Sequence, residues 1–225
     1  MKSTAAALAM LLGFASNAAA HDPNATITWN REISRIVYER CGVCHRPGGT
    51  SFSLLTYLDA QPRAAAIKDA VLSRRMPPWG AVKGFGSFRN DQGLSQEQIA
   101  LITSWVEHGA LKGNNPNSLQ PPPDFKALAA YEMPKDTTAV SGEFTVTQAA
   151  IVDGIFPDRV AKGASLQIVA ALPDGAIEPL LWLYEYTDKY RHPFLFRKPV
   201  ELPPGTVIRG VPKSSRVLLI PAATP

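Results

Sequence analysis

Both cysteines of this 225-residue chain are separated by only two residues, and a histidine follows the second directly. Residues 39–49 read ERCGVCHRPGG, in which Cys41, Cys44 and His45 form the pattern C-x-x-C-H. Two thiols at this spacing can add to the two vinyl groups of one haem, and the adjacent imidazole can then bind the iron as the proximal ligand. The pattern therefore predicts one covalently attached haem c.

Other uses of a cysteine pair fit this sequence less well. A disulfide framework needs more cysteines that close longer loops. A structural zinc site needs four ligands, and the chain contains no second cysteine pair. A redox dithiol usually lies where a strand meets a helix, whereas the residues around Cys41 follow a helical pattern.

A haem iron held by His45 has a second axial position, and Met76 is the candidate for it. Met76 lies in SRRMPPWG, where two prolines restrict the backbone beside the thioether. The alternative is an ordinary methionine that fills a gap in the core. Met133 is a weaker candidate for the iron, and His108 is expected to be a surface histidine at the end of a helix.

An aromatic residue and several basic residues follow the motif closely enough to surround the edge of a haem or its propionates. A solvated basic surface is the equally open alternative for each basic residue. These residues are Arg63, Arg74, Arg75, Trp79 and Lys83.

Three stretches before residue 112 have the apolar spacing of helices. The first, residues 30–45, is expected to be capped by Asn30 and to carry the motif at its end. The second is residues 63–75. The third is residues 94–110, which Ser95 and Gln98 open as a capping box.

Composition predicts the division of the chain. Residues 1–20 combine Lys2, an uncharged apolar run and a small-residue site before His21, which is typical of a signal peptide cleaved after Ala20. Residues 21–112 are expected to form a small all-α domain, residues 113–124 a proline-rich linker, and residues 125–225 a second domain. His21 could chelate copper with its own amine, but the sequence offers no convincing second histidine.

The second domain is expected to be an antiparallel β-sandwich of jelly-roll-like form. Residues 165–186 predict two strands joined by a turn at Pro173, Asp174 and Gly175. Short alternating or apolar runs at residues 142–148, 192–210 and 214–221 predict further strands. The fold class is therefore multi-domain, α followed by β.

The segments CGVCHRPGG, SFSLLTYLDA, AIKDAVLSRRMPPW and FGSFRNDQGLSQEQIALITSWVEHGA resemble the cytochrome c domains of bacterial exported proteins. In those proteins the domain is fused to copper type II, ascorbate-dependent monooxygenase domains of the peptidylglycine-hydroxylating kind. The likeness covers nearly all of residues 28–112 and implies that Met76 is the distal iron ligand.

The second domain resembles a truncated part of the copper-binding half of that family, in GIFPDRVAKG, ALPDGAIEPLLWL and FRKPVELPPGTVI. The family's His-x-His copper pair would fall at Asp158 and Val160. Valine cannot bind a metal, and a lone carboxylate is a weak substitute for two imidazoles. We therefore expect haem c as the cofactor and do not expect copper.

The sequence thus favours a periplasmic or secreted mono-haem c-type cytochrome that transfers electrons to and from partner proteins, rather than a catalyst. The alternatives are a domain that feeds electrons to a copper- and oxygen-dependent oxidoreductase, and a haem-based sensor of small gases. The formal charge of +4 is mild and the basic residues are scattered, so nucleic acid is not an expected partner. No membrane-spanning segment is expected after the signal peptide.

Overall fold

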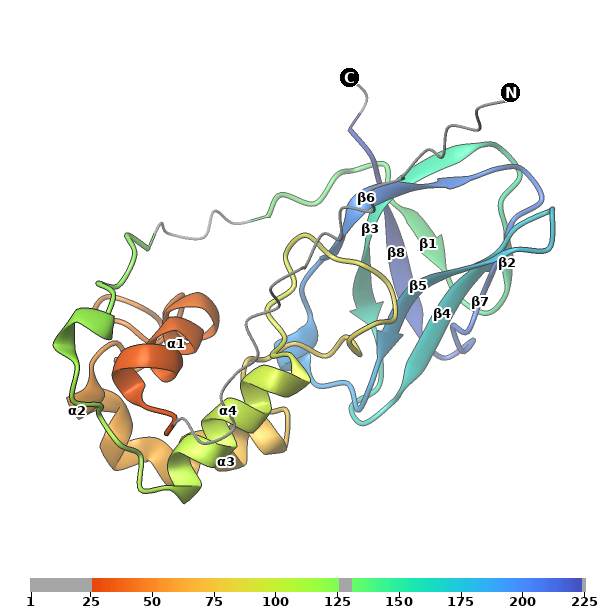
Figure 1. Ribbon diagram of the computed structural model, residues 1–225. Coiled ribbons are helices and arrows are strands. Elements are labelled where there is room, and N and C mark those ends of the chain that lie inside the picture. The colour runs from red at the N-terminus through yellow and green to blue at the C-terminus, as the bar shows by residue number, and fades with distance from the viewer. Residues whose placement is uncertain (1–25, 126–130, 224–225) are drawn as a thin grey trace, which may run out of the picture.

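The computed structural model of the chain describes residues 26–125 and 131–223, so the expected signal peptide and His21 lie outside it. Within these ranges the α-helices come first along the chain and the strands second, with the short η4 (Asp188–Tyr190) before the sixth strand. The α-helices and the strands lie at opposite ends of the molecule (Figure 1). The α-then-β order predicted from the sequence is therefore present.

The helical part contains four α-helices, one π-helical turn and two 3-10 turns within the described residues. They are η1 (Trp29–Ile33), α1 (Ser34–Arg40), α2 (Tyr57–Ala60), η2 (Gln61–Arg63), α3 (Ala64–Leu72), α4 (Gln96–Glu107) and η3 (Pro116–Ser118). All three expected helical stretches contain one of these α-helices. The short α2, which Thr56 caps through a capping box with Asp59, was not anticipated.

Local signals set some helix ends correctly and others not. The capping box of α4 is confirmed, because Ser95 Oγ accepts from the Gln98 amide and the Gln98 side chain accepts from the Ser95 amide. The predicted Asn30 cap is wrong. Asn30 lies inside η1, is buried, and donates to the carbonyls of Gly113 and Asn115 at 3.2 and 3.3 Å. Asn30 therefore bonds to residues distant in the sequence instead of capping a helix, as its local propensity predicted.

The helical part has its own apolar core. Trp29 and Trp105 are its largest buried residues, with ring centroids 6.2 Å apart. The indole of Trp105 donates to the Leu111 carbonyl at 3.0 Å, so its polar atom is satisfied inside the core. This core joins η1, α1, α3 and α4 into one unit.

Two antiparallel four-stranded sheets form the β part, with strand orders β1-β8-β3-β6 and β2-β7-β4-β5. Side chains from both sheets share one apolar core, which confirms the predicted antiparallel β structure. The strands are β1 (Thr138–Val140), β2 (Phe144–Thr145), β3 (Ala150–Arg159), β4 (Leu166–Ala171), β5 (Ile177–Leu183), β6 (Phe194–Leu202), β7 (Val207–Arg209) and β8 (Arg216–Pro221).

The predicted turn between β4 and β5 is confirmed. Leu172 and Ala176 are hydrogen-bonded across it, Asp174 accepts from the Ala176 amide, and Gly175 has a φ of +89° that favours glycine. By contrast, β3 was not anticipated, although it has 10 residues and pairs with both β6 and β8. It contains Pro157, a residue depleted in strands, next to a shift in its register with β8.

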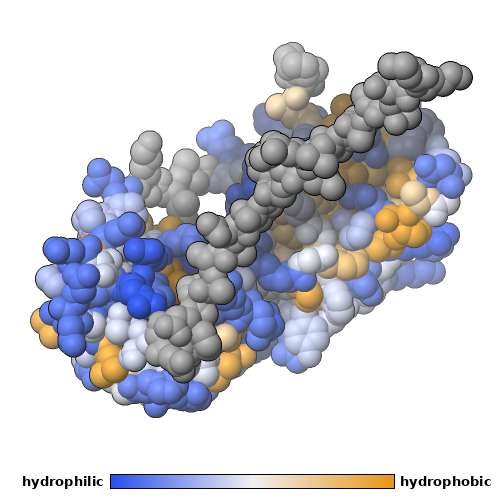
Figure 2. All heavy atoms as spheres, viewed as in Figure 1, coloured by the Kyte–Doolittle hydropathy of each residue, from blue (hydrophilic) through white to orange (hydrophobic). Residues whose placement is uncertain are grey.

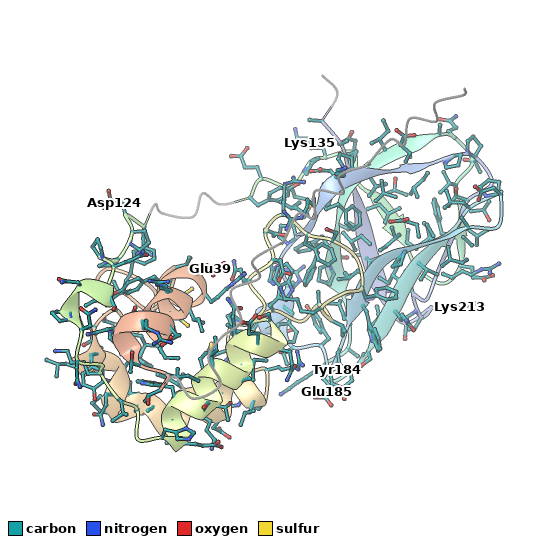
Figure 3. All side chains as sticks on the ribbon, viewed as in Figure 1. Glu39, Asp124, Lys135, Tyr184, Glu185 and Lys213 are labelled. Carbon is teal, nitrogen blue, oxygen red and sulfur yellow. The ribbon has the colours of Figure 1, made fainter. Side chains whose placement is uncertain are left out.

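The connector between the parts is exposed and extended where it is described. No helix or strand lies between Leu119 and Phe125, and residues 119–124 are exposed. Figure 3 shows Asp124 beside the helical part and Lys135 on the β part. Three consecutive prolines, residues 121–123, favour an extended backbone here.

A second and tighter connection joins the two parts. Residues 79–90, here called the crossing segment, lie in the chain between α3 and α4, yet Trp79, Ala81 and Phe88 are buried in the core of the β sheets. Phe88 stacks on Phe196 of β6 with ring centroids 5.8 Å apart. The sequence assigned this segment to the helical domain, but its apolar side chains complete the other core.

The outer surface shows polar residues over most of the helical part in the view of Figure 2, with hydrophobic residues more frequent over the β part. No helix among the described residues is long and apolar enough to cross a membrane.

The role of the crossing segment can be tested with Phe88→Ala. Removing this buried ring should lower the free energy of unfolding by about 3 to 5 kcal/mol, because the β core loses the ring and retains a cavity. Urea unfolding followed by tryptophan fluorescence measures the loss. Leu58→Ala is the matched control, since Leu58 is 81 % exposed and should change stability by less than about 0.5 kcal/mol. Equal effects of the two substitutions would contradict the observed packing.

Candidate functional site

Cys41, Cys44 and His45 lie on a tight turn that follows α1 directly. Cys41 is the C-cap of α1, and its amide donates to the Val37 carbonyl at 2.9 Å. The amides of Cys44 and His45 both donate to the Cys41 carbonyl, at 3.1 and 2.8 Å. The motif therefore lies just past the helix rather than within it. The Cys41 carbonyl oxygen holds Cys44 and His45 close to Cys41 by accepting both of their amides.

Two glycines allow other residues to approach this turn closely. A Cβ on Gly42 would lie 2.4 Å from the ring of Phe125, the last described residue of the connector. A Cβ on Gly49 would lie 2.3 Å from the Cys44 carbonyl oxygen. Both distances are too short for a side chain, so glycine at these positions permits the connector and the following loop to pack on the motif.

The loop that follows the motif folds back over it. Ser51 donates its amide to the Cys44 carbonyl and Leu54 donates to the His45 carbonyl, both at 3.1 Å. This return brings the Phe52 carbonyl to the imidazole of His45. The Phe52 ring also packs edge-on against that imidazole, with centroids 4.7 Å apart.

The orientation of His45 leaves one ring nitrogen for a ligand. Its Nδ1 lies 3.0 Å from the Phe52 carbonyl oxygen. A carbonyl oxygen can only accept, so Nδ1 donates to it, and in the neutral imidazole Nε2 has the free lone pair. Metal-binding histidines are commonly held in this way, with one nitrogen bonded to a carbonyl and the other to the metal. The geometry of His45 thus suits metal ligation through Nε2.

The two cysteines are unpaired and partly buried. Burial raises the pKa of the Cys41 thiol to about 12, and the nearby charge of Cys44 contributes in the same direction. Cys41 is therefore a neutral thiol near pH 7. Dithiol oxidoreductases depend on a cysteine with a lowered pKa, so Cys41 is poorly suited to be the reactive thiol of such an enzyme. Two thiols and one oriented imidazole fit the donor set of a covalently attached haem.

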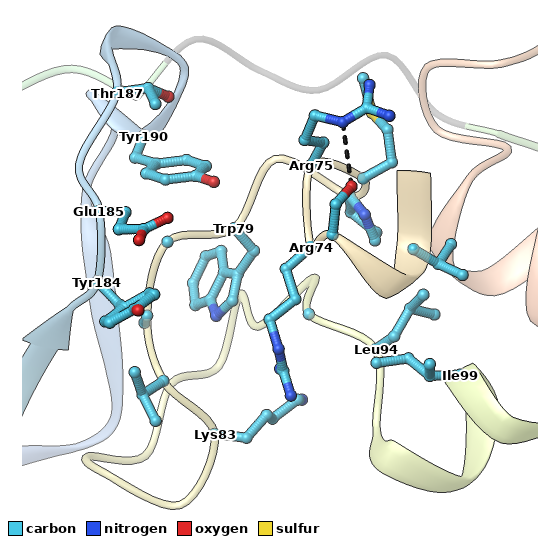
Figure 4. A pocket seen from close by; sticks show the side chains of 18 of the residues that line it. Arg74, Arg75, Trp79, Lys83, Leu94, Ile99, Tyr184, Glu185, Thr187 and Tyr190 are labelled. Carbon is cyan, nitrogen blue, oxygen red and sulfur yellow. Dashed lines mark hydrogen bonds between the residues drawn. The ribbon is translucent and has the colours of Figure 1, made fainter. Parts of the chain in front are cut away.

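Met76 lies outside α3 but remains tied to it. The amides of Arg75 and Met76 both donate to the Ala70 carbonyl, at 2.9 and 3.1 Å. The Met76 residue is 36 % exposed and lines a pocket of about 610 Å³. One wall of this pocket comes from the helical part and includes Leu94 and Ile99, while the opposite wall comes from the β part (Figure 4).

The structure does not bring all four predicted haem residues to one pocket. Cys41, Cys44 and His45 are adjacent on their turn, whereas the residues lining the pocket beside Met76 include none of the three. The sequence-based assignment of Met76 to the iron therefore stays a prediction.

The predicted basic residues divide between the two places. Arg63 lies over the Phe52 ring, with its guanidinium carbon 4.9 Å from the ring centroid. Arg74, Arg75 and Lys83 line the pocket beside Met76. Arg75 pairs with Asp69 and Lys83 pairs with Asp91. Arg74 hydrogen-bonds weakly to the neutral Gln96 side chain, at 3.4 Å.

The other histidine and methionine candidates have ordinary surroundings. His108 is the C-cap of α4, exposed, with Nδ1 2.7 Å from the Ser104 carbonyl oxygen. Met133 lies beyond the connector and is partly buried.

The positions compared with a copper pair are engaged in other interactions. The Asp158 carboxylate, at the end of β3, forms ion pairs with Arg191 and Arg216. Val160 is partly buried and packs against the core of the β sheets. The described residues contain no group of three or more histidine, cysteine, aspartate or glutamate side chains placed to hold a metal ion.

His192 packs against Trp79, a residue that lines the pocket, and was not predicted from the sequence to lie there. It precedes β6, and its ring stacks on Trp79 with centroids 5.2 Å apart and an interplanar angle of 23°. The ring also lies 3.3 Å, through Nδ1, from the Pro193 carbonyl oxygen and packs against the Phe194 ring, with centroids 4.5 Å apart. Burial lowers the pKa of His192, and the carbonyls of Pro193 and Pro78 oppose this only in part. Nothing in the local sequence marks His192, because Trp79, the indole on which it stacks, lies more than a hundred residues away.

Comparison with known proteins gives no further information about this site. No family model matches the chain, and no curated protein or solved structure is significantly similar to it.

His192 predicts a pH dependence of stability. Its pKa in the folded protein is below the ordinary value of 6.5. As the pH falls through about 6.5, the unfolded chain therefore binds a proton more readily than the folded one, and stability decreases. The loss grows until the pH reaches the folded-state pKa. Urea unfolding at pH 7.5 and 5.5 measures this loss of stability. Both pH values lie above the ordinary pKa values of carboxylates, so these groups contribute little to the difference.

His192→Phe should reduce this pH-dependent loss, because phenylalanine retains an aromatic ring and cannot be protonated. The matched control His108→Gln, which changes an exposed histidine, should leave the loss as it is. If His192→Phe and native protein lose the same stability between the two pH values, the neutral state of His192 is not responsible.

Proposed function

We propose that this chain is an exported mono-haem c-type cytochrome that transfers electrons between partner proteins. The observation that supports it most directly is the bond between His45 Nδ1 and the Phe52 carbonyl at 3.0 Å, beside two unpaired cysteines at haem-attachment spacing. Haem c is attached outside the cytoplasm in bacteria, so the proposal includes a periplasmic or secreted location and a cleaved signal peptide. The resemblance to exported cytochrome c domains belongs to the same proposal.

Each residue of the motif has a defined task in this proposal. Cys41 and Cys44 hold the haem through thioether bonds, and His45 binds the iron through Nε2. The Phe52 carbonyl keeps the imidazole in one orientation and one tautomer. When bound, the haem supplies an iron that accepts and releases one electron. The protein residues set its potential through the axial ligands and through burial.

Met76 completes the proposed site as the second axial ligand. An iron with both axial positions filled has no place for a substrate, which favours electron transfer over catalysis. The β part would then be a sandwich-type module that supports or docks the cytochrome. Its Asp158 carboxylate is already paired with two arginines, so copper-dependent oxygenation is not proposed.

A haem-based gas sensor is the second candidate. The observation that favours it is the separation of Met76, which lines a pocket without His45. A methionine that leaves the iron readily would open a position for carbon monoxide or another small gas. The Met76 variant described below distinguishes the two functions.

The attachment of haem is tested with the double substitution Cys41→Ser, Cys44→Ser. Native protein, exported together with the haem c maturation machinery, should carry one haem per chain that survives denaturing electrophoresis. The double variant should carry none, because serine cannot form the thioether bonds. Mass spectrometry and the pyridine haemochrome spectrum measure both. His108→Gln is the control and should retain the haem. Native protein without covalent haem would refute the proposed function.

Met76→Ala tests the second axial ligand. Native protein should be low-spin, with the weak far-red iron–methionine charge-transfer band. The variant should lose that band, bind carbon monoxide in the reduced state, and show a lower potential, by some fraction of the roughly 0.8 V over which axial ligands tune haem proteins. Met133→Ala is the matched control and should behave as native protein. An unchanged low-spin spectrum and potential in Met76→Ala would show that another group binds the iron. Carbon monoxide binding by native protein would favour the gas sensor.

A further inference from the structure

The crossing segment is bonded to the outer strands of both β sheets. The β5 strand ends one sheet and β6 ends the other. The Val82 amide donates to the Trp182 carbonyl of β5 at 2.9 Å, and the Arg89 amide donates to the Leu195 carbonyl of β6 at 2.9 Å. The segment therefore runs across the open side of the β part and supplies partners to two otherwise free strand edges.

Charged and polar side chains reinforce this attachment at its far end. Arg89 forms a two-pronged ion pair with Asp153 of β3, at 2.8 and 2.6 Å. Asn90 donates to the Pro193 carbonyl and accepts from the Leu195 amide. Because backbone pairing, an ion pair and buried rings act together, the position of the crossing segment is set by the β part.

The first residues of the crossing segment, Trp79 and Gly80, pack against the residues that precede β6. Trp79 is 7 % exposed and stacks between His192 and the β core, with the Phe194 ring centroid 4.8 Å away. The next residue, Gly80, lies so close to the Tyr190 ring that a Cβ would be 2.4 Å from it. Figure 4 shows Trp79 and Tyr190 on neighbouring sides of the pocket.

Met76 thus lies between two fixed anchors. On one side, its amide is bonded to Ala70 of α3. On the other, Trp79 stacks on His192 and is buried in the β core. A methionine side chain is flexible and its sulfur is a weak ligand, so backbone anchors close to it decide whether it stays on a metal.

We propose that the β part positions the Met76 side chain, and that Trp79 and His192 are the positioning residues that transmit this support. The inference rests on the proposed function and assigns a task to the β part within it. The β part is then a structural component of the redox site, and loosening its contact with Trp79 frees Met76 from the iron.

The test uses His192→Leu and Trp79→Leu in the full chain. Both should retain haem, because the attachment motif is untouched. Both should show a weakened far-red band and about tenfold stronger carbon monoxide binding in the reduced state, the size of effect typical of residues that orient a metal ligand. His192→Phe, which restores a ring against Trp79, should recover part of the band.

Leu219→Ala is the matched control for stability. Leu219 is buried in the same core but lies on β8, which pairs with β1 and β3 rather than with the crossing segment. This variant should be less stable than native protein and keep the native band. If folded His192→Leu and Trp79→Leu keep the native band and carbon monoxide affinity, the inference is wrong. Should Trp79→Leu fail to fold, His192→Leu and His192→Phe decide.

Amide hydrogen exchange provides a readout that does not depend on haem. In His192→Leu, peptides covering residues 76–82 should exchange about tenfold faster than in native protein, while those of α4 stay protected. If native protein carries no haem, the proposed function is refuted. If His192→Leu nevertheless shows the faster exchange at residues 76–82, the positioning role stands. Unchanged exchange at residues 76–82 would overturn the positioning role whether or not haem is bound.

Discussion

Burial of Trp79 and Phe88 in the core of the β sheets is the contact on which the rest of the architecture depends. These rings belong to a segment between two helices, so the helical part and the β part cannot move apart without exposing them to water. Burying a large aromatic side chain contributes a few kcal/mol, a sizeable share of the total stability of a typical domain. The proline-rich connector therefore closes a loop between two parts that the crossing segment already joins.

The candidate site depends on a smaller constraint of the same kind. The imidazole of His45 is oriented by the Phe52 carbonyl, and that carbonyl arrives because the intervening loop turns back at Gly49 and hydrogen-bonds to Cys44. Each contact is local in sequence. The motif is consequently a compact unit that could form within any helical frame able to hold α1. Met76 differs, because contacts with a distant part of the chain hold the backbone that follows it.

Several features could be predicted because short-range interactions decide them. Ser95 and Gln98 form their capping box three residues apart, and Asp174 and Gly175 specify their turn within five residues. The predictions failed where a distant partner competed. Asn30 bonds to carbonyls more than eighty residues away instead of capping a helix. Strand β3 was not predicted; it contains Pro157, a residue depleted in strands, and pairing on both sides outweighs that local preference.

The sequence by itself determined which side chains carry the candidate chemistry, namely two thiols and an adjacent imidazole at fixed spacing, and the order of α-helices before strands. Residue types and short separations carry this information, because thiols, imidazole and turn residues act through their nearest neighbours. Only the tertiary structure decided which core receives Trp79 and where His192 lies. A buried aromatic residue packs wherever apolar surface needs covering, and that surface is assembled from strands more than sixty residues away in the chain.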